Sequence, residues 1–134
     1  MKFLSDEWIK QAKIVTAEKL DPEKDLKNST ASLLNVINNI PPNGKSIYFY
    51  ISVKDGKLAE MALDDTGSLQ DKDAEFTVTG NYDTFVSIFK GEMSTLIALI
   101  KNRVKIKGDK KKALQFVKPI DKLTSCLREI ETEF

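Results

Sequence analysis

Apolar residues recur every three or four positions at the start of the chain, which is the period of an α-helix. Ser5 suits a helix N-cap because the next two residues are acidic and favour the positive end of the helix dipole. This pattern predicts a helix over residues 5–20. Asp21 and Pro22 suit a second helix start, and the apolar residues between 26 and 37 extend it to about residue 39. The sequence therefore predicts two N-terminal helices within residues 5–40.

The period changes to two after residue 46, as expected for β-strands. Apolar residues at the odd positions from 47 to 53 alternate with Tyr48, Tyr50 and Ser52. Asp55 and Gly56 then suit a hairpin turn, and a return strand reaches residue 63. Residues 64–73 are polar and predict a loop, and residues 75–80 predict a further strand.

The rest of the chain switches between the two periods. Apolar residues from 82 to 89 share one helical face, and Gly91 suits the end of that helix. A short apolar helix is expected over residues 93–101, with Asn102 in the left-handed conformation at its end. Residues 103–107 predict a strand with one basic face. A last helical region begins near Gly108 and Asp109, and Pro119 inside it predicts a kink or two consecutive helices.

This order of elements predicts the α+β class, with a mainly antiparallel sheet of four to five strands and helices covering one face. The pattern identifies four strands, so a fifth would come from residues 64–73 or from a longer strand that splits. We expect residues 1–134 to form a single domain, in which residues 46–134 hold the sheet and any ligand pocket.

The composition excludes several classes of function but does not identify one. The 134 residues carry a net charge of +1, so no overall field attracts nucleic acid. Histidine is absent, which removes histidine-based nucleophile pairs, general bases and metal sites. Cys126 is the only cysteine and cannot form an intrachain disulfide. Because we recognise no signal peptide and no membrane span, we expect a cytoplasmic protein. The absence of histidine leads us to expect a protein that is not an enzyme and that holds no metal or cofactor.

The motifs after residue 46 follow one another in a characteristic order. An acidic-flanked strand over residues 73–79 leads into a helix that contains Phe85 and Phe89 and ends at Gly91. A short apolar helix follows, and then a basic and apolar strand that closes on Lys-Gly-Asp at residues 107–109. This succession resembles the sterol carrier protein type 2 family, well over residues 46–118 and loosely over residues 5–40. Asn102 stands where the family usually has glycine.

The resemblance implies a five-stranded sheet and helices that enclose an apolar tunnel for sterols, fatty acids or other lipids. It carries over no catalytic residues. We therefore expect a carrier that binds and transfers an apolar ligand by burial alone. The residues expected to line its tunnel are Phe49, Ile51, Met61, Phe85, Phe89, Leu96, Ile100, Leu114 and Val117. The alternative is that all these residues form an ordinary close-packed core.

Two further readings concern partners. The basic residues Arg103, Lys105, Lys107 and Lys110 suit transient contact with an anionic membrane surface, although lysines on an edge strand also discourage aggregation. The same apolar groove could instead hold a partner helix or form a homodimer, which would make the chain an interaction module. A carboxylate-based or lysine-based enzyme is a third reading, for which the sequence singles out no residue.

Overall fold

The computed structural model describes residues 1–134, and its nine helices and strands confirm the α+β class. The elements in chain order are α1 (Asp6–Lys19), β1 (Ala31–Ile40), β2 (Lys45–Lys54), β3 (Lys57–Asp64), β4 (Phe76–Asn81), α2 (Tyr82–Lys90), α3 (Thr95–Ile100), β5 (Val104–Lys107) and α4 (Lys110–Leu127).

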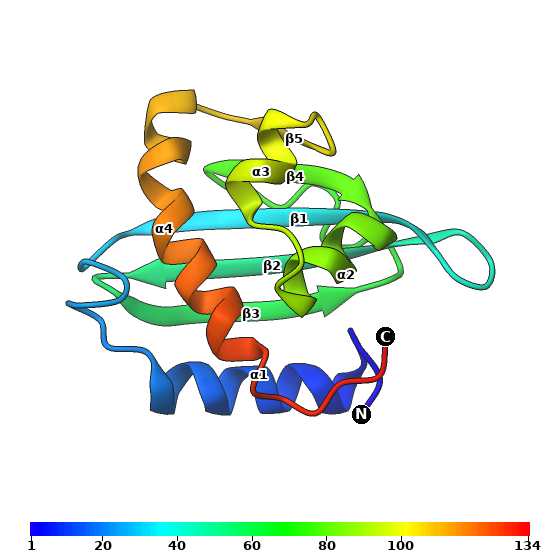
Figure 1. Ribbon diagram of the computed structural model, residues 1–134, viewed down its shortest axis with the longest axis horizontal. Coiled ribbons are helices and arrows are strands. Elements are labelled where there is room, and N and C mark those ends of the chain that lie inside the picture. The colour runs from blue at the N-terminus through cyan, green and yellow to red at the C-terminus, as the bar shows by residue number, and fades with distance from the viewer.

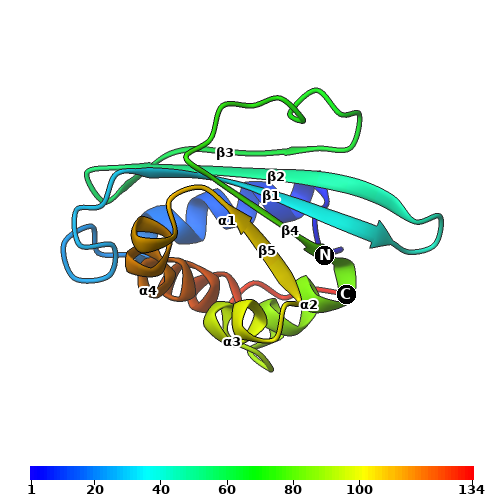
Figure 2. The same ribbon diagram turned by 90° about the horizontal axis from the view of Figure 1, so that it is seen from above.

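One five-stranded sheet organises the molecule, in the order β3-β2-β1-β4-β5. The β1–β4 pair is parallel and the other three pairs are antiparallel. The expected mainly antiparallel sheet is therefore confirmed, with five strands. All four helices lie on one face of this sheet, and the loop between β3 and β4 lies on the other (Figures 1 and 2).

The predicted helix up to residue 39 is wrong, because residues 31–40 form β1 at the centre of the sheet. Leu33, Leu34 and Ile37 are spaced as on a helix face, which misled the prediction. In the strand, Leu33 and Ile37 face the helices while Leu34 faces the opposite side, and all three are buried. The fifth strand is thus β1, and neither residues 64–73 nor a split strand supplies it.

The chain between α1 and β1 consists of turns. Asp21 stabilises them by accepting hydrogen bonds from the backbone N–H groups of Glu23 and Lys24, both at 2.9 Å. These bonds, that from Lys24 above all, hold the pKa of the Asp21 carboxyl below its usual range. The cap predicted at Asp21 therefore exists, but it closes a turn and no helix continues from it.

The C-terminal region is one helix followed by an extended tail. α4 continues through Pro119 and ends at Leu127, so two consecutive helices are not formed. The tail then lies beside the N-terminus, where the N–H of Phe3 donates to the carbonyl of Glu133 at 2.9 Å. The two ends of the chain consequently lie together in Figure 1.

Trp8 anchors α1 to the core. Its side chain is 1% exposed and packs edge-on against Phe49 and Phe89, with ring centroids 5.8 Å apart in both pairs. Its indole Nε1 donates to Thr132 Oγ1 of the C-terminal tail at 3.2 Å. One residue thus joins α1, the sheet, α2 and the tail.

Candidate ligand cavity

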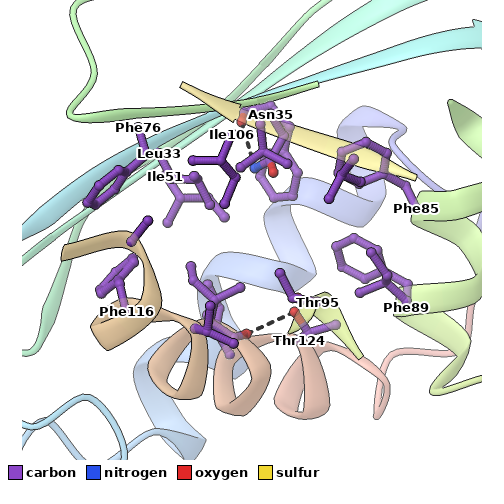
Figure 3. A pocket seen from close by; sticks show the side chains of 18 of the residues that line it. Leu33, Asn35, Ile51, Phe76, Phe85, Phe89, Thr95, Ile106, Phe116 and Thr124 are labelled. Carbon is purple, nitrogen blue, oxygen red and sulfur yellow. Dashed lines mark hydrogen bonds between the residues drawn. The ribbon is translucent and has the colours of Figure 1, made fainter. Parts of the chain in front are cut away.

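An apolar cavity lies between the sheet and the helices. Sixteen of its nineteen lining residues are hydrophobic, and none carries an ionisable side chain. The walls come from β1, β2, β4, β5, α2, α4 and the start of α3 (Figure 3). The cavity therefore provides an apolar environment with no acid or base in its wall.

Strand register determines which side chains form the floor of the cavity. Leu33 is paired with Ile51 on one side and with Phe76 on the other. Side chains paired across neighbouring strands lie on the same face of a sheet, so these three form one apolar row under the helices. Alternation along each strand places the row on the cavity side.

A glycine lets α2 and β5 approach the floor. A Cβ added at Gly80 would lie 2.9 Å from Val104 Cγ1 and 3.2 Å from Phe85 Cε2. Both distances are shorter than ordinary carbon contacts, so a larger residue would push these cavity walls apart. Phe85 reaches the cavity because position 80 has no side chain.

The volume of the cavity is about 60 Å³. A dry apolar cavity of roughly 150 Å³ is enough for benzene, so a sterol or a long acyl chain needs more room than this. Binding such a ligand would require the helices to move away from the sheet.

Five of the nine residues predicted to line a tunnel lie in the cavity wall. These are Phe49, Ile51, Phe85, Phe89 and Val117. Met61 is buried in β3 but lies outside the lining. Leu96, Ile100 and Leu114 are 41%, 67% and 57% exposed and also lie outside it.

The outward position of Leu96 and Ile100 follows from how α3 packs. This six-residue helix buries Thr95 and Ala98, packs Leu99 partly against the core, and exposes Leu96, Ile97 and Ile100. Leu114 stands next to the buried Ala113 on α4 and faces away from the cavity. Composition cannot show which side of a mostly apolar helix packs inward, so the sequence prediction chose the largest residues.

Sequence reasoning missed the part of the floor that β1 supplies. Leu33 and Asn35 line the cavity but fall in the segment predicted as a helix. Phe76 and Val78 of β4 line the cavity as well, although they are not among the residues that the sequence predicts there. The sequence carries no alternation that marks this part of the floor, because buried apolar residues lie on both faces of β1.

Three polar residues interrupt the apolar lining, namely Asn35, Thr95 and Thr124. The Thr124 hydroxyl donates to the carbonyl of Ile120 within α4 at 2.9 Å. The Asn35 side-chain amide donates through Nδ2 to the carbonyl of Phe49 at 3.1 Å. These bonds hold the Thr124 hydroxyl and the Asn35 NH₂ group within the fold.

The other candidate groups lie away from the cavity. Cys126 is buried, its Sγ lies 3.6 Å from the carbonyl of Val15, and burial raises the pKa of its thiol. Asp64 accepts hydrogen bonds from the Thr66 side chain at 2.6 Å and from the Thr66 and Leu69 N–H groups at 3.0 Å. These bonds, led by the Thr66 hydroxyl, hold the pKa of Asp64 well below its usual range.

Two of the four predicted basic residues, Lys105 and Lys107, lie together on the far face of the sheet. Val104 and Ile106 of β5 line the cavity, so Lys105 and Lys107 between and after them face the opposite side of the sheet. Lys112, at the start of α4, lies 4.0 Å from Glu75 as an ion pair. No helix of the chain is long and apolar enough to cross a bilayer.

A five-stranded sheet with helices enclosing an apolar cavity on one face defines a small α+β domain with the sterol carrier protein fold. The model of the SCP-2 sterol transfer family matches residues 14–121. The chain therefore belongs to the SCP-2 sterol transfer family, as the motifs after residue 46 indicated. The sequence matches no curated protein.

Solved structures share the fold at low sequence identity. A conserved hypothetical protein of Thermus thermophilus matches with a TM-score of 0.80 at 17% identity, over 99% of this chain and 92% of that protein. A crystal structure of sterol carrier protein 2 matches with a TM-score of 0.77 at 16% identity, over 96% and 99% of the two chains. Palmitated SCP2L2 from Aedes aegypti matches with a TM-score of 0.58 at 16% identity, over 84% and 91%.

The same fold also occurs inside an enzyme. The inverting sec-alkylsulfatase Pisa1 from Pseudomonas sp. matches with a TM-score of 0.50 at 25% identity. The match covers 76% of this chain but 14% of the sulfatase. The fold alone therefore does not separate a carrier from a part of a larger catalytic protein.

Proposed function

We propose that this chain binds a lipid or another apolar ligand reversibly in the cavity between the sheet and the helices, and catalyses no covalent step. The observation that carries the proposal is the lining, which is apolar over sixteen of nineteen residues and has no ionisable side chain. Family membership and the palmitated relative with the same fold support it.

Burial of hydrocarbon is a sufficient driving force for such binding. Each buried CH₂ group contributes about 0.8 kcal/mol, so a chain of roughly ten carbons offsets the cost of association. Part of this gain is spent on widening the cavity beyond its volume of about 60 Å³. We therefore expect affinity to rise with chain length until the ligand no longer fits under the helices.

A substitution that fills the cavity tests the proposal without adding a buried charge. Val117 lines the cavity from α4, and Val117→Phe places a ring in the space that a ligand would occupy. We expect this variant to bind a fluorescent fatty acid at least about tenfold more weakly, in an equilibrium titration, because the ring competes with the ligand. Leu114→Phe is the matched control on the same helix, because Leu114 is 57% exposed and lies outside the lining.

Native mass spectrometry of the purified protein gives the starting point for that titration. A co-purifying adduct of lipid mass that organic extraction removes would support the carrier. Wild-type protein that stays empty and binds neither the fluorescent fatty acid nor the neutral dye N-phenyl-1-naphthylamine would overturn the proposal. An empty dimer would favour the interaction module instead.

We propose further that the carrier exchanges its ligand at anionic membrane surfaces through α3. Leu96, Ile97 and Ile100 are 41%, 41% and 67% exposed on this short helix, and Lys101 and Arg103 follow directly and are exposed. Apolar side chains beside cations suit the boundary between headgroups and acyl chains. The inner side of α3 reaches the cavity wall through Thr95, so the helix adjoins both the membrane and the ligand.

A further inference from the structure

Asn35 is a polar residue in an otherwise apolar row of the cavity floor. The register places it between Phe49 of β2 and Val78 of β4, and Val78 is in turn paired with Ile106 of β5. Asn35 is 8% exposed and lies on β1, the central strand of the sheet. No neighbour across the strands can hydrogen-bond to its amide through a side chain.

The amide of Asn35 uses its donor side and leaves its acceptor free. Nδ2 donates to the carbonyl of Phe49 at 3.1 Å, and a carbonyl can only accept, so this bond sets the orientation of the amide. Oδ1 accepts no hydrogen bond from any group of the chain. The side chain of Asn35 points from the sheet toward the helices in Figure 3.

The free oxygen faces the cavity. No fully buried polar side-chain atom of the protein lacks a hydrogen-bond partner, so the unpaired Oδ1 is in contact with open space. Asn35 is a lining residue, and the cavity is the space on its side of the sheet. The floor therefore presents one unpaired acceptor to whatever enters.

An acceptor in this place distinguishes between ligand head groups. A hydroxyl can donate to Oδ1, whereas a hydrocarbon or an ether leaves the oxygen unpaired in an apolar environment, which is unfavourable. An ionised carboxylate would bring a negative charge toward the amide oxygen where the wall carries no cation. Neutral donors are the head groups that match this site.

We propose that Asn35 Oδ1 accepts a hydrogen bond from the ligand, so that the cavity selects neutral alcohols with an apolar body, bound with the hydroxyl against the sheet. This inference rests on the proposed function and specifies its ligand class. Asn35 acts as a specificity-determining residue, while the apolar walls supply the affinity.

Two isomers with equal numbers of heavy atoms test the proposal. 1-Decanol has a hydroxyl donor and 1-methoxynonane has none, so their relative ability to displace the neutral dye N-phenyl-1-naphthylamine reports the hydrogen bond. We expect wild-type protein to bind the alcohol about fivefold more tightly than the ether, the factor that one net hydrogen bond provides. Asn35→Leu, which removes both polar atoms at similar size, is expected to bring this ratio to about one while dye binding persists.

Asn38→Leu is the matched control, since Asn38 also lies on β1 but outside the cavity lining. This variant should keep the wild-type ratio. Asn35→Val, which suits a strand, serves as a second variant if Asn35→Leu does not fold by circular dichroism.

The outcomes separate the two proposals. If wild-type protein binds the dye and both isomers equally, or if the ratio survives in the Asn35 variants, the role of Asn35 is overturned and the carrier stands. If wild-type protein binds neither the dye nor either isomer, the proposed function fails as well.

Discussion

At the scale of single residues, the close contact of Gly80 with the residues around it determines the shape of one corner of the cavity. Gly80 lies where β4 meets α2, and a Cβ at this position would come within 3.2 Å of the backbone oxygen of Arg103 as well as of Phe85. The contacts of Gly80 involve β5 and α2, so its role cannot be read from residues next to it in the sequence.

Gly80→Ala should lower the free energy of unfolding by about 1–3 kcal/mol, since the methyl group forces Val104 or Phe85 out of place. Urea denaturation followed by circular dichroism measures this change. An unchanged unfolding midpoint would show that the walls accommodate the methyl group freely, and the close packing inferred at this corner would then be wrong.

At the scale of elements, the sequence correctly predicted the helix ends and turns that are marked by residues next to them in the chain. Ser5 caps α1 by accepting a hydrogen bond from the Trp8 N–H at 3.2 Å, and Gly91 ends α2 in the left-handed conformation with φ of 82°. The hairpin at Asp55 and Gly56 formed as predicted, as did the left-handed Asn102. Each of these depends on residues within one turn of the chain.

β1 could not be predicted in the same way. Its apolar residues are buried on both faces, so the alternation that marks a half-exposed strand is missing. Only its two neighbours, β2 and β4, supply the backbone partners that make it a strand. β1 contributes two residues to the lining, Leu33 and Asn35, and the predicted lining includes neither because their segment was predicted as a helix.

α3 is the element whose exposed face gives a test of membrane exchange. We expect the double variant Ile97→Ser/Ile100→Ser to slow transfer of a fluorescent fatty acid out of phosphatidylglycerol-containing vesicles by about tenfold, because less apolar surface enters the bilayer. The affinity of the same variant for the dye N-phenyl-1-naphthylamine should change by less than about twofold, since neither residue lines the cavity.

Ile14→Ser is the control for this experiment, because Ile14 is exposed to a similar degree, 48%, but lies on α1. Transfer that is equally slowed in the Ile14 variant would mean that general surface hydrophobicity matters and that α3 has no special role.

At the scale of the whole molecule, the sheet and the helices differ in how they can open. Every floor strand that contributes lining residues is tied into a continuous ladder of backbone hydrogen bonds. α3 is joined to its neighbours by short segments that contain the left-handed residues Gly91 and Asn102, and it packs by side-chain contacts. Widening the cavity therefore involves the helical layer more readily than the sheet.

Hydrogen exchange should show this difference. Without ligand, we expect the amides of residues 91–103 to exchange at least about tenfold faster than those of β1 and β2. Saturation with 1-decanol should slow exchange chiefly in α3 and in the first half of α4, because the ligand stabilises the closed helical layer. Slowing confined to β1 and β2 would contradict this mode of opening.

The sequence by itself determined the class of the fold, the hairpin, the helix ends and the succession of motifs after residue 46, because these depend on residues close together in the chain. Only the tertiary structure decided which apolar side chains face the cavity. It placed Phe85 and Val117 inward and Ile100 outward, and it brought Asn35 of a misassigned segment into the centre of the floor. The physical reason is that the buried face of a strand or helix is chosen by the elements packed against it, and these lie far away in the sequence.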